Sequence, residues 1–75
     1  MMENVREAVR LAHTFERIGW YGKSLDSWLL AVHFLRQMDD DDDAASAIAI
    51  CERNATRMRA ELTRRDRLHR VVLIK

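Results

Sequence analysis

Apolar residues return every three or four positions along most of the chain, which is the period of an amphipathic α-helix. The first such segment carries a stripe of Val5, Ala8, Val9, Ala12, Phe15 and Ile18, which Leu11 widens. Asn4 followed by Glu7 fits a capping box, in which the two side chains satisfy free backbone N–H groups at a helix start. We therefore predict a first helix over residues 4–18.

A turn with two glycines follows this helix. Gly19 suits the left-handed backbone conformation found just after a helix C-terminus, where Trp20 would pack back on Phe15. Ser24 belongs to the residue types that cap helix N-termini. The turn is therefore predicted to span residues 19–23.

The second helix is predicted over residues 24–38 and is apolar on nearly every side. Its polar positions form only a narrow line, made of Asp26, His33 and Gln37. A helix of this kind is normally buried on most of its surface, and two partner helices from a short chain leave part of it uncovered. We therefore expect self-association or a bound partner protein, with Trp28 and Phe34 among the binding residues.

Five consecutive aspartates, Asp39–Asp43, separate this helix from the next, because negative charge disfavours a helix C-terminus and favours an N-terminus. Apolar positions then alternate steps of four and three, as in a coiled-coil seam, through Ala44, Ile48, Cys51, Ala55, Met58 and Leu62. We predict a third helix over residues 43–70, buried as far as Leu62. Residues 71–75 form an exposed apolar tail, and the sequence leaves open whether it folds back, continues the helix into a partner or pairs as a strand.

The expected fold is all-α, a small three-helix bundle in which residues 1–75 form a single domain. A chain of 75 residues buries only about 60% of its unfolded surface, so association would add stability. We therefore expect an oligomer, a homodimer in the simplest case.

Composition removes several classes of protein. One cysteine cannot form an internal disulfide, which excludes the disulfide-rich secreted scaffolds and favours the reducing cytoplasm. The longest strongly apolar run, residues 28–35, is far shorter than the roughly 20 residues of a membrane span. The acidic N-terminal residues are not those of a signal peptide, so we expect neither a membrane partner nor export.

Charge divides the chain into two parts. Residues 1–43 carry nine acidic and five basic side chains, a balance of −4, and residues 44–75 carry three and eight, a balance of +5. On the predicted third helix, four arginines within about 80° of one another face away from the apolar seam. They are Arg53, Arg57, Arg64 and Arg67. This stripe is either a solvated helix face or a surface that contacts nucleic-acid phosphates through paired guanidinium hydrogen bonds.

The acidic run Asp39–Asp43 has three interpretations. It matches the first, third and fifth positions of an EF-hand loop, but Ala44 stands where that loop needs glycine and Ile50 where it needs glutamate. A solvated loop that caps the third helix is the simplest interpretation. Alternatively, its carboxylates imitate a phosphate backbone and occupy a basic groove on a partner.

No catalytic constellation emerges from the sequence. The three histidines, His13, His33 and His69, lie on different segments without a zinc-ligand spacing, and Cys51 falls on the apolar seam, where a buried inert thiol is expected. We therefore predict that the chain is not an enzyme and has no catalytic residues, metal, cofactor or small-molecule substrate.

The preferred functional hypothesis is a small regulatory protein that binds another protein. It would act as an adaptor or inhibitor of a larger machine, of the kind that phages and mobile elements encode. The predicted binding residues are Trp28, Phe34, Leu73, Ile74, Asp39, Asp40, Asp41 and Asp42. The alternative is a nucleic-acid-binding module that uses the arginine stripe of the third helix.

Overall fold

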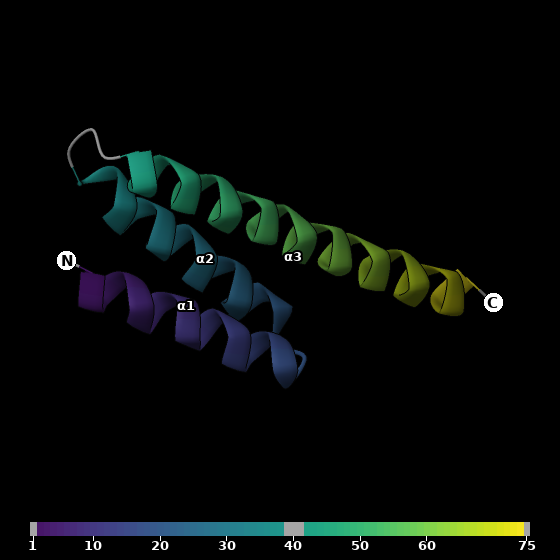
Figure 1. Ribbon diagram of the computed structural model, residues 1–75. Coiled ribbons are helices and arrows are strands. Elements are labelled where there is room, and N and C mark those ends of the chain that lie inside the picture. The colour runs from purple at the N-terminus through teal and green to yellow at the C-terminus, as the bar shows by residue number, and fades with distance from the viewer. Residues whose placement is uncertain (1, 39–41, 75) are drawn as a thin grey trace.

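The computed structural model describes the backbone of residues 2–38 and 42–74 and the side chains of residues 3–38 and 43–65. These residues form three helices and no strand (Figure 1). They are α1 (Met2–Arg17), α2 (Tyr21–Arg36) and α3 (Asp42–Ile74). The predicted all-α, three-helix fold is therefore confirmed.

Helix α2 lies between the other two helices. It packs against both α1 and α3, whereas the backbones of α1 and α3 do not approach each other (Figure 1). The apolar surface predicted for this helix is thus buried on two sides, against α1 and against α3. The side of the α1–α2 pair away from α3 has no third helix over it.

The turn after α1 is the predicted glycine-terminated helix end. Gly19 has a φ of 87°, in the left-handed region where a side chain is disfavoured. The Trp20 amide donates to the carbonyl of Phe15 at 2.8 Å, and the Gly19 amide donates to the carbonyl of Glu16 at 3.1 Å. These two bonds define a Schellman motif, and its expected apolar contact is the stack of Phe15 and Trp20, with ring centroids 6.0 Å apart.

Both predicted N-terminal caps are wrong. Helix α2 begins at Tyr21, so Ser24 lies inside it, where its buried Oγ donates to the carbonyl of Ala12 at 2.8 Å. This hydroxyl joins two helices across twelve residues of sequence, a role that a local capping pattern cannot reveal. Asn4 likewise lies within the first turn of α1, which begins at Met2.

Small residues dominate the contacts between the helices. The fully or nearly fully buried positions include Ala8, Ala12, Ala31 and Ala55, with Trp28, Leu35 and Met58 as the large side chains among them. Alanines allow helix axes to approach closely, and the three large side chains fill the space that remains. The predicted seam of the third helix is buried at Ala44, Cys51, Ala55 and Met58, half-buried at Ile48, and 37% exposed at Leu62.

The expectation that Trp28 is exposed for binding is wrong. Its side chain is only 2% exposed, because it points between the two outer helices and meets the ring of His13 edge-on, with centroids 5.0 Å apart. Trp28 is therefore part of the core.

Helix α3 is longer than predicted and continues to Ile74, so the backbone of Val71–Ile74 is helical rather than extended. It projects past the turn between α1 and α2 (Figure 1). Arg65 contacts that turn, with its guanidinium 4.5 Å from the ring centroid of Tyr21 and a 3.4 Å hydrogen bond to the carbonyl of Gly19. Within the described residues, no helix has an apolar stretch long enough to cross a bilayer.

Candidate protein-binding surface

One edge of α1 carries large apolar side chains that the fold leaves in contact with solvent. Leu11, Phe15 and Ile18 follow one another at steps of four and three residues and so lie along the same edge. Leu11 is 38% exposed, Ile18 is 53% exposed, and Phe15 is half-buried. Trp20, at the end of this edge, is 55% exposed.

The adjoining edge of α2 continues this apolar surface. Lys23, Leu30 and Phe34 are separated by seven and four residues and share one edge of α2. The Lys23 ammonium lies 5.9 Å from the ring centroids of both Phe15 and Trp20, so this edge of α2 borders the apolar edge of α1. Leu30 is 45% exposed and Phe34 is half-buried.

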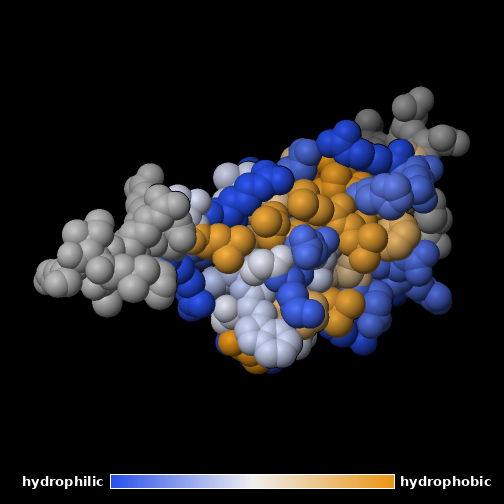
Figure 2. Space-filling model, turned by 180° about the vertical axis from the view of Figure 1, so that it is seen from behind, coloured by the Kyte–Doolittle hydropathy of each residue, from blue (hydrophilic) through white to orange (hydrophobic). Residues whose placement is uncertain are grey.

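We call this surface the α1–α2 face and define it as Leu11, Phe15, Ile18, Trp20, Leu30 and Phe34. Figure 2 shows exposed hydrophobic side chains on the side of the molecule opposite to the view of Figure 1, and this apolar surface extends beyond the α1–α2 face toward the C-terminal part of α3. Leu29 and Leu62, 39% and 37% exposed, also contribute apolar surface outside the face. Leu11 and Ile18 are seven residues apart, so the face follows α1 for about 10 Å at 1.5 Å per residue. That is about two helical turns.

Carboxylates border the α1–α2 face. On α1, the exposed Glu7 lies about 40° around the helix from Leu11, and Glu3 precedes it by one turn. On α2, the exposed Asp26 lies about 40° around the helix from Leu30. Basic groups lie there too: Arg10 is within about 20° of Glu3 around α1, and the Lys23 ammonium lies against Phe15 and Trp20. Charges of both signs therefore border the face.

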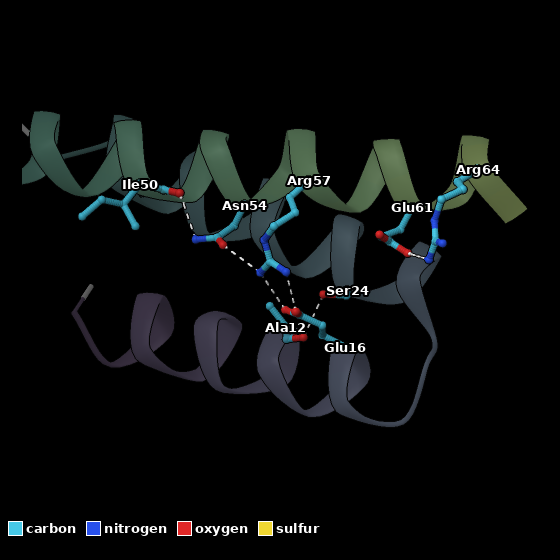
Figure 3. A network of polar contacts seen from close by, with 8 residues as sticks. All are labelled: Ala12, Glu16, Ser24, Ile50, Asn54, Arg57, Glu61 and Arg64. Carbon is cyan, nitrogen blue, oxygen red and sulfur yellow. Dashed lines mark hydrogen bonds and ion pairs between the residues drawn. The ribbon is translucent and has the colours of Figure 1, made fainter.

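The opposite edge of α1 is polar and connects to α3. Arg57 donates two hydrogen bonds to the carboxylate of Glu16, at 2.6 and 3.0 Å, and a third to Asn54 Oδ1 at 3.0 Å (Figure 3). The hydrogen bonds from Arg57 lower the pKa of Glu16, and the same carboxylate raises the pKa of Arg57. This ion pair bridges two helices whose backbones do not touch.

An open cavity of about 410 Å³ lies beside this ion pair, lined by His13, Glu16, Arg17, Tyr21 and Arg57. No sequence pattern predicts this cavity, because its residues come from three helices and Glu16 and Arg57 are 41 positions apart. The Glu16 carboxylate and the Arg57 guanidinium, two of the charged groups that line the cavity, already pair with each other. The cavity therefore offers little unpaired charge to a ligand.

The arginine stripe on α3 is less free than the sequence predicts. Arg57 is held by Glu16, and Arg64 donates to Glu61 on the same helix at 2.8 Å, which raises the pKa of Arg64. Arg53 is exposed, and the side chain of Arg67 lies outside the described residues. Phosphate binding by the stripe stays a prediction, but two of its four guanidinium groups already have carboxylate partners.

The structure brings few of the other predicted binding residues together. Phe34 is half-buried and belongs to the α1–α2 face, whereas Trp28 is buried in the core and contributes nothing to that face. Asp42 begins α3. Asp39, Asp40 and Asp41 lie outside the described residues, as do the side chains of Asp42, Leu73 and Ile74.

Sequence reasoning missed Leu11, Ile18, Trp20 and Leu30 as surface residues. A signal did exist at Leu11, which lies off the centre of the α1 stripe. Ile18 and Trp20 were interpreted only as parts of a helix end.

Comparison of the chain with protein-family models, with curated proteins and with solved structures finds no match.

Proposed function

We propose that the chain is a small non-enzymatic regulatory protein that acts by protein–protein binding through the α1–α2 face. The observation that supports this most directly is the exposure of Ile18 and Trp20, each more than half accessible, on a face whose other members are also apolar. Contiguous exposed apolar surface with a polar rim is typical of interaction sites.

The face is also preorganised for binding. Trp20 is held by the Schellman hydrogen bonds, by its stack on Phe15 and by the Lys23 ammonium. A rigid aromatic side chain loses little conformational freedom when a partner covers it, so more of its burial free energy contributes to affinity. Tryptophan is also among the residue types that most often dominate binding energy at interfaces.

The regulator would act as an adaptor or inhibitor of a larger machine, in the way that small phage-encoded proteins do. The single cysteine, Cys51, is buried, and burial raises the pKa of its thiol, which makes the thiol less reactive. A chain with one cysteine has no internal disulfide, which favours a reducing compartment such as the cytoplasm. The five aspartates of residues 39–43 would add a phosphate-like contact with a basic partner, an idea supported by their charge density.

The test is affinity capture of tagged protein from its host lysate, with and without nuclease, using two matched variants. Ile18→Ser with Trp20→Ser removes the two most exposed side chains of the face. Ile50→Ser removes an equally exposed side chain, 56% accessible, from α3. We expect the wild type and the Ile50→Ser variant to retain a stoichiometric protein after nuclease treatment, and the double variant to lose it.

Capture that is equal for all three proteins would contradict the role of the face. Loss of every partner on nuclease treatment would instead favour nucleic-acid binding by α3. In that case affinity for random duplex should fall as salt rises, with a slope set by the number of phosphates contacted.

A further inference from the structure

Two rows of arginines with the same spacing run along the outer helices. The row on α1 is Arg6, Arg10 and Arg17, and the row on α3 is Arg53, Arg57 and Arg64. Both rows step by four and then by seven residues, so the members of each lie within about 40° of one another around their helix. Each row extends over eleven residues, which is about 16 Å at 1.5 Å per residue.

The two rows meet at the open cavity beside α1 and α3. Arg17 and Arg57 both line it, together with His13. The other two members of the α1 row lie within about 60° of His13 around the helix, and the whole row is at least about 100° from Leu11. Both helices run toward the α1–α2 turn, so the rows also share a direction (Figure 1). We call the two rows together the arginine surface.

Most of these arginines are available to a ligand. Four of the six are exposed and form no hydrogen bond or ion pair with the described residues, namely Arg6, Arg10, Arg17 and Arg53. The other two are held in place by carboxylates: Arg57 pairs with Glu16 and Arg64 pairs with Glu61 (Figure 3). The α1 row therefore supplies three unpaired guanidinium groups, and the predicted stripe of α3 supplies one.

Acidic residues are few beside the arginine surface. None lies within the angular span of either row. On α1 the nearest is Glu3, about 20° beyond Arg10. On α3 the nearest are Asp43 and Glu61, each about 40° beyond Arg57. The six arginines outnumber these acids even when Glu16 is added to them, so the surface keeps an excess of positive charge.

Evenly repeated positive charge fits a partner whose negative charge is also evenly repeated. Guanidinium groups bind phosphates through paired hydrogen bonds, and each strand of a duplex carries a phosphate about every 3.4 Å, so one row spans about five of them. Proteins that bind single strands also offer aromatic rings on which bases stack. Here both rings that line the cavity already have partners, Trp28 for His13 and the Arg65 guanidinium for Tyr21. The surface therefore fits a duplex backbone better than unpaired bases.

We propose that the arginine surface binds the phosphate backbone of duplex nucleic acid, with α1 and α3 both contributing. Contacts to phosphates carry no sequence information, so the binding has little sequence preference. The proposal does not depend on the proposed function, because the arginine surface and the α1–α2 face share no residue. A chain that uses both surfaces joins a protein partner to a nucleic acid.

Fluorescence anisotropy with a labelled random duplex of about 20 base pairs, between about 50 and 200 mM salt, tests the proposal. The wild type should bind at low salt, and its affinity should fall with a log–log slope of about −0.9 for each phosphate contacted. Arg10→Gln with Arg17→Gln should make that slope shallower by about two, and Arg53→Gln should make it shallower by about one.

Arg36→Gln with Arg59→Gln is the matched control for the α1 double variant. It removes the same charge from two exposed positions outside the arginine surface, since Arg36 lies on α2 and Arg59 lies about 120–160° around α3 from the row. We expect the control to keep the wild-type slope. Circular dichroism checks that every variant keeps its helices.

Several results would overturn the proposal. The first is no binding of the duplex at about 50 mM salt, and the second is a slope that the α1 double variant leaves unchanged or that the control reduces equally. Tighter binding of the corresponding single strand would exclude the duplex backbone as the ligand. Competition by polyglutamate as effective as that by duplex of equal charge would assign the surface to an acidic protein. Ile18→Ser with Trp20→Ser should leave duplex binding unchanged, which keeps this test separate from that of the α1–α2 face.

Discussion

The two edges of α1 differ in how far the folded chain covers or pairs their side chains. The edge toward α3 is polar, and the Glu16–Arg57 pair satisfies it within the chain at 2.6 and 3.0 Å. The other edge is apolar, and Leu11 and Ile18 remain 38% and 53% exposed. Folding alone thus satisfies the first edge, whereas the apolar side chains of the second edge stay exposed on the single chain.

This difference follows from the number and arrangement of the helices. The open cavity beside α1 and α3 is crossed by the Glu16–Arg57 pair, while the backbones of these two helices stay apart. The α1–α2 face has no such polar bridge, and its apolar residues are the ones that a second protein would bury under our proposal.

The two tryptophans should show the largest contrast. Trp28→Ala removes a side chain that is only 2% exposed, and we expect it to lower the free energy of unfolding by about 3–5 kcal/mol. Trp20→Ala, at 55% exposure, should cost much less stability and act mainly on binding. Urea unfolding followed by circular dichroism measures both, and equal losses would contradict the division into core and surface.

A smaller effect on stability is expected at the turn between α1 and α2. Gly19→Ala places a Cβ at a φ of 87°, where the backbone strain should cost about 1 kcal/mol, although the nearest outside atom is 3.8 Å away. Gly22→Ala is the matched control, because Gly22 is helical with nothing within 4 Å of the added Cβ. We expect that control to stabilise the fold by about 0.5–1 kcal/mol in thermal unfolding. Shifts of the same sign for both would rule out this assignment of the turn.

Weakening the Glu16–Arg57 pair should lower the free energy of unfolding modestly and leave association unchanged. Glu16→Gln weakens the paired hydrogen bonds from Arg57, and because the pair is partly solvated we expect a loss of about 0.5–1 kcal/mol that shrinks with added salt. Arg64→Gln breaks an exposed pair within one helix and should cost less. If Glu16→Gln changed self-association as strongly as Ile18→Ser with Trp20→Ser, the two edges would not be independent.

The smallest predicted effect is the pH dependence of the same pair. Arg57 lowers the pKa of Glu16 in the folded state, so the contribution of Glu16 is present above its unfolded pKa and is lost as pH falls through the folded pKa. The difference in unfolding free energy between the wild type and Glu16→Gln should therefore shrink from about pH 6 to about pH 3. A difference that stays constant or grows on acidification would contradict this assignment.

Local patterns predicted much of the fold. The Schellman end at Gly19 and the stack of Trp20 on Phe15 depend on residues within one turn of each other, and both are confirmed. The buried seam of α3 at Cys51 and Met58 follows from helical spacing and is also confirmed. Such features need no knowledge of how the helices are arranged.

What the sequence could not predict depends on that arrangement. The hydroxyl of Ser24 bonds Ala12 on another helix, so a residue typical of caps became an interior one. A helical wheel of α2 shows that most positions are apolar, but only the placement of α1 and α3 decides that Trp28 is buried and Leu30 exposed. The α1–α2 face could therefore not be defined before the helices were placed.

Quenching of tryptophan fluorescence by acrylamide tests the central claim most directly, because it reports on Trp20 in the assembled protein. The free chain should show one accessible component from Trp20 and one inaccessible component from Trp28, and a Trp20→Phe variant should keep only the latter. Our account predicts that the accessible component disappears when the chain dimerises or is saturated with its partner protein. Persistence of that component in the assembled protein would show that the α1–α2 face is not the binding surface.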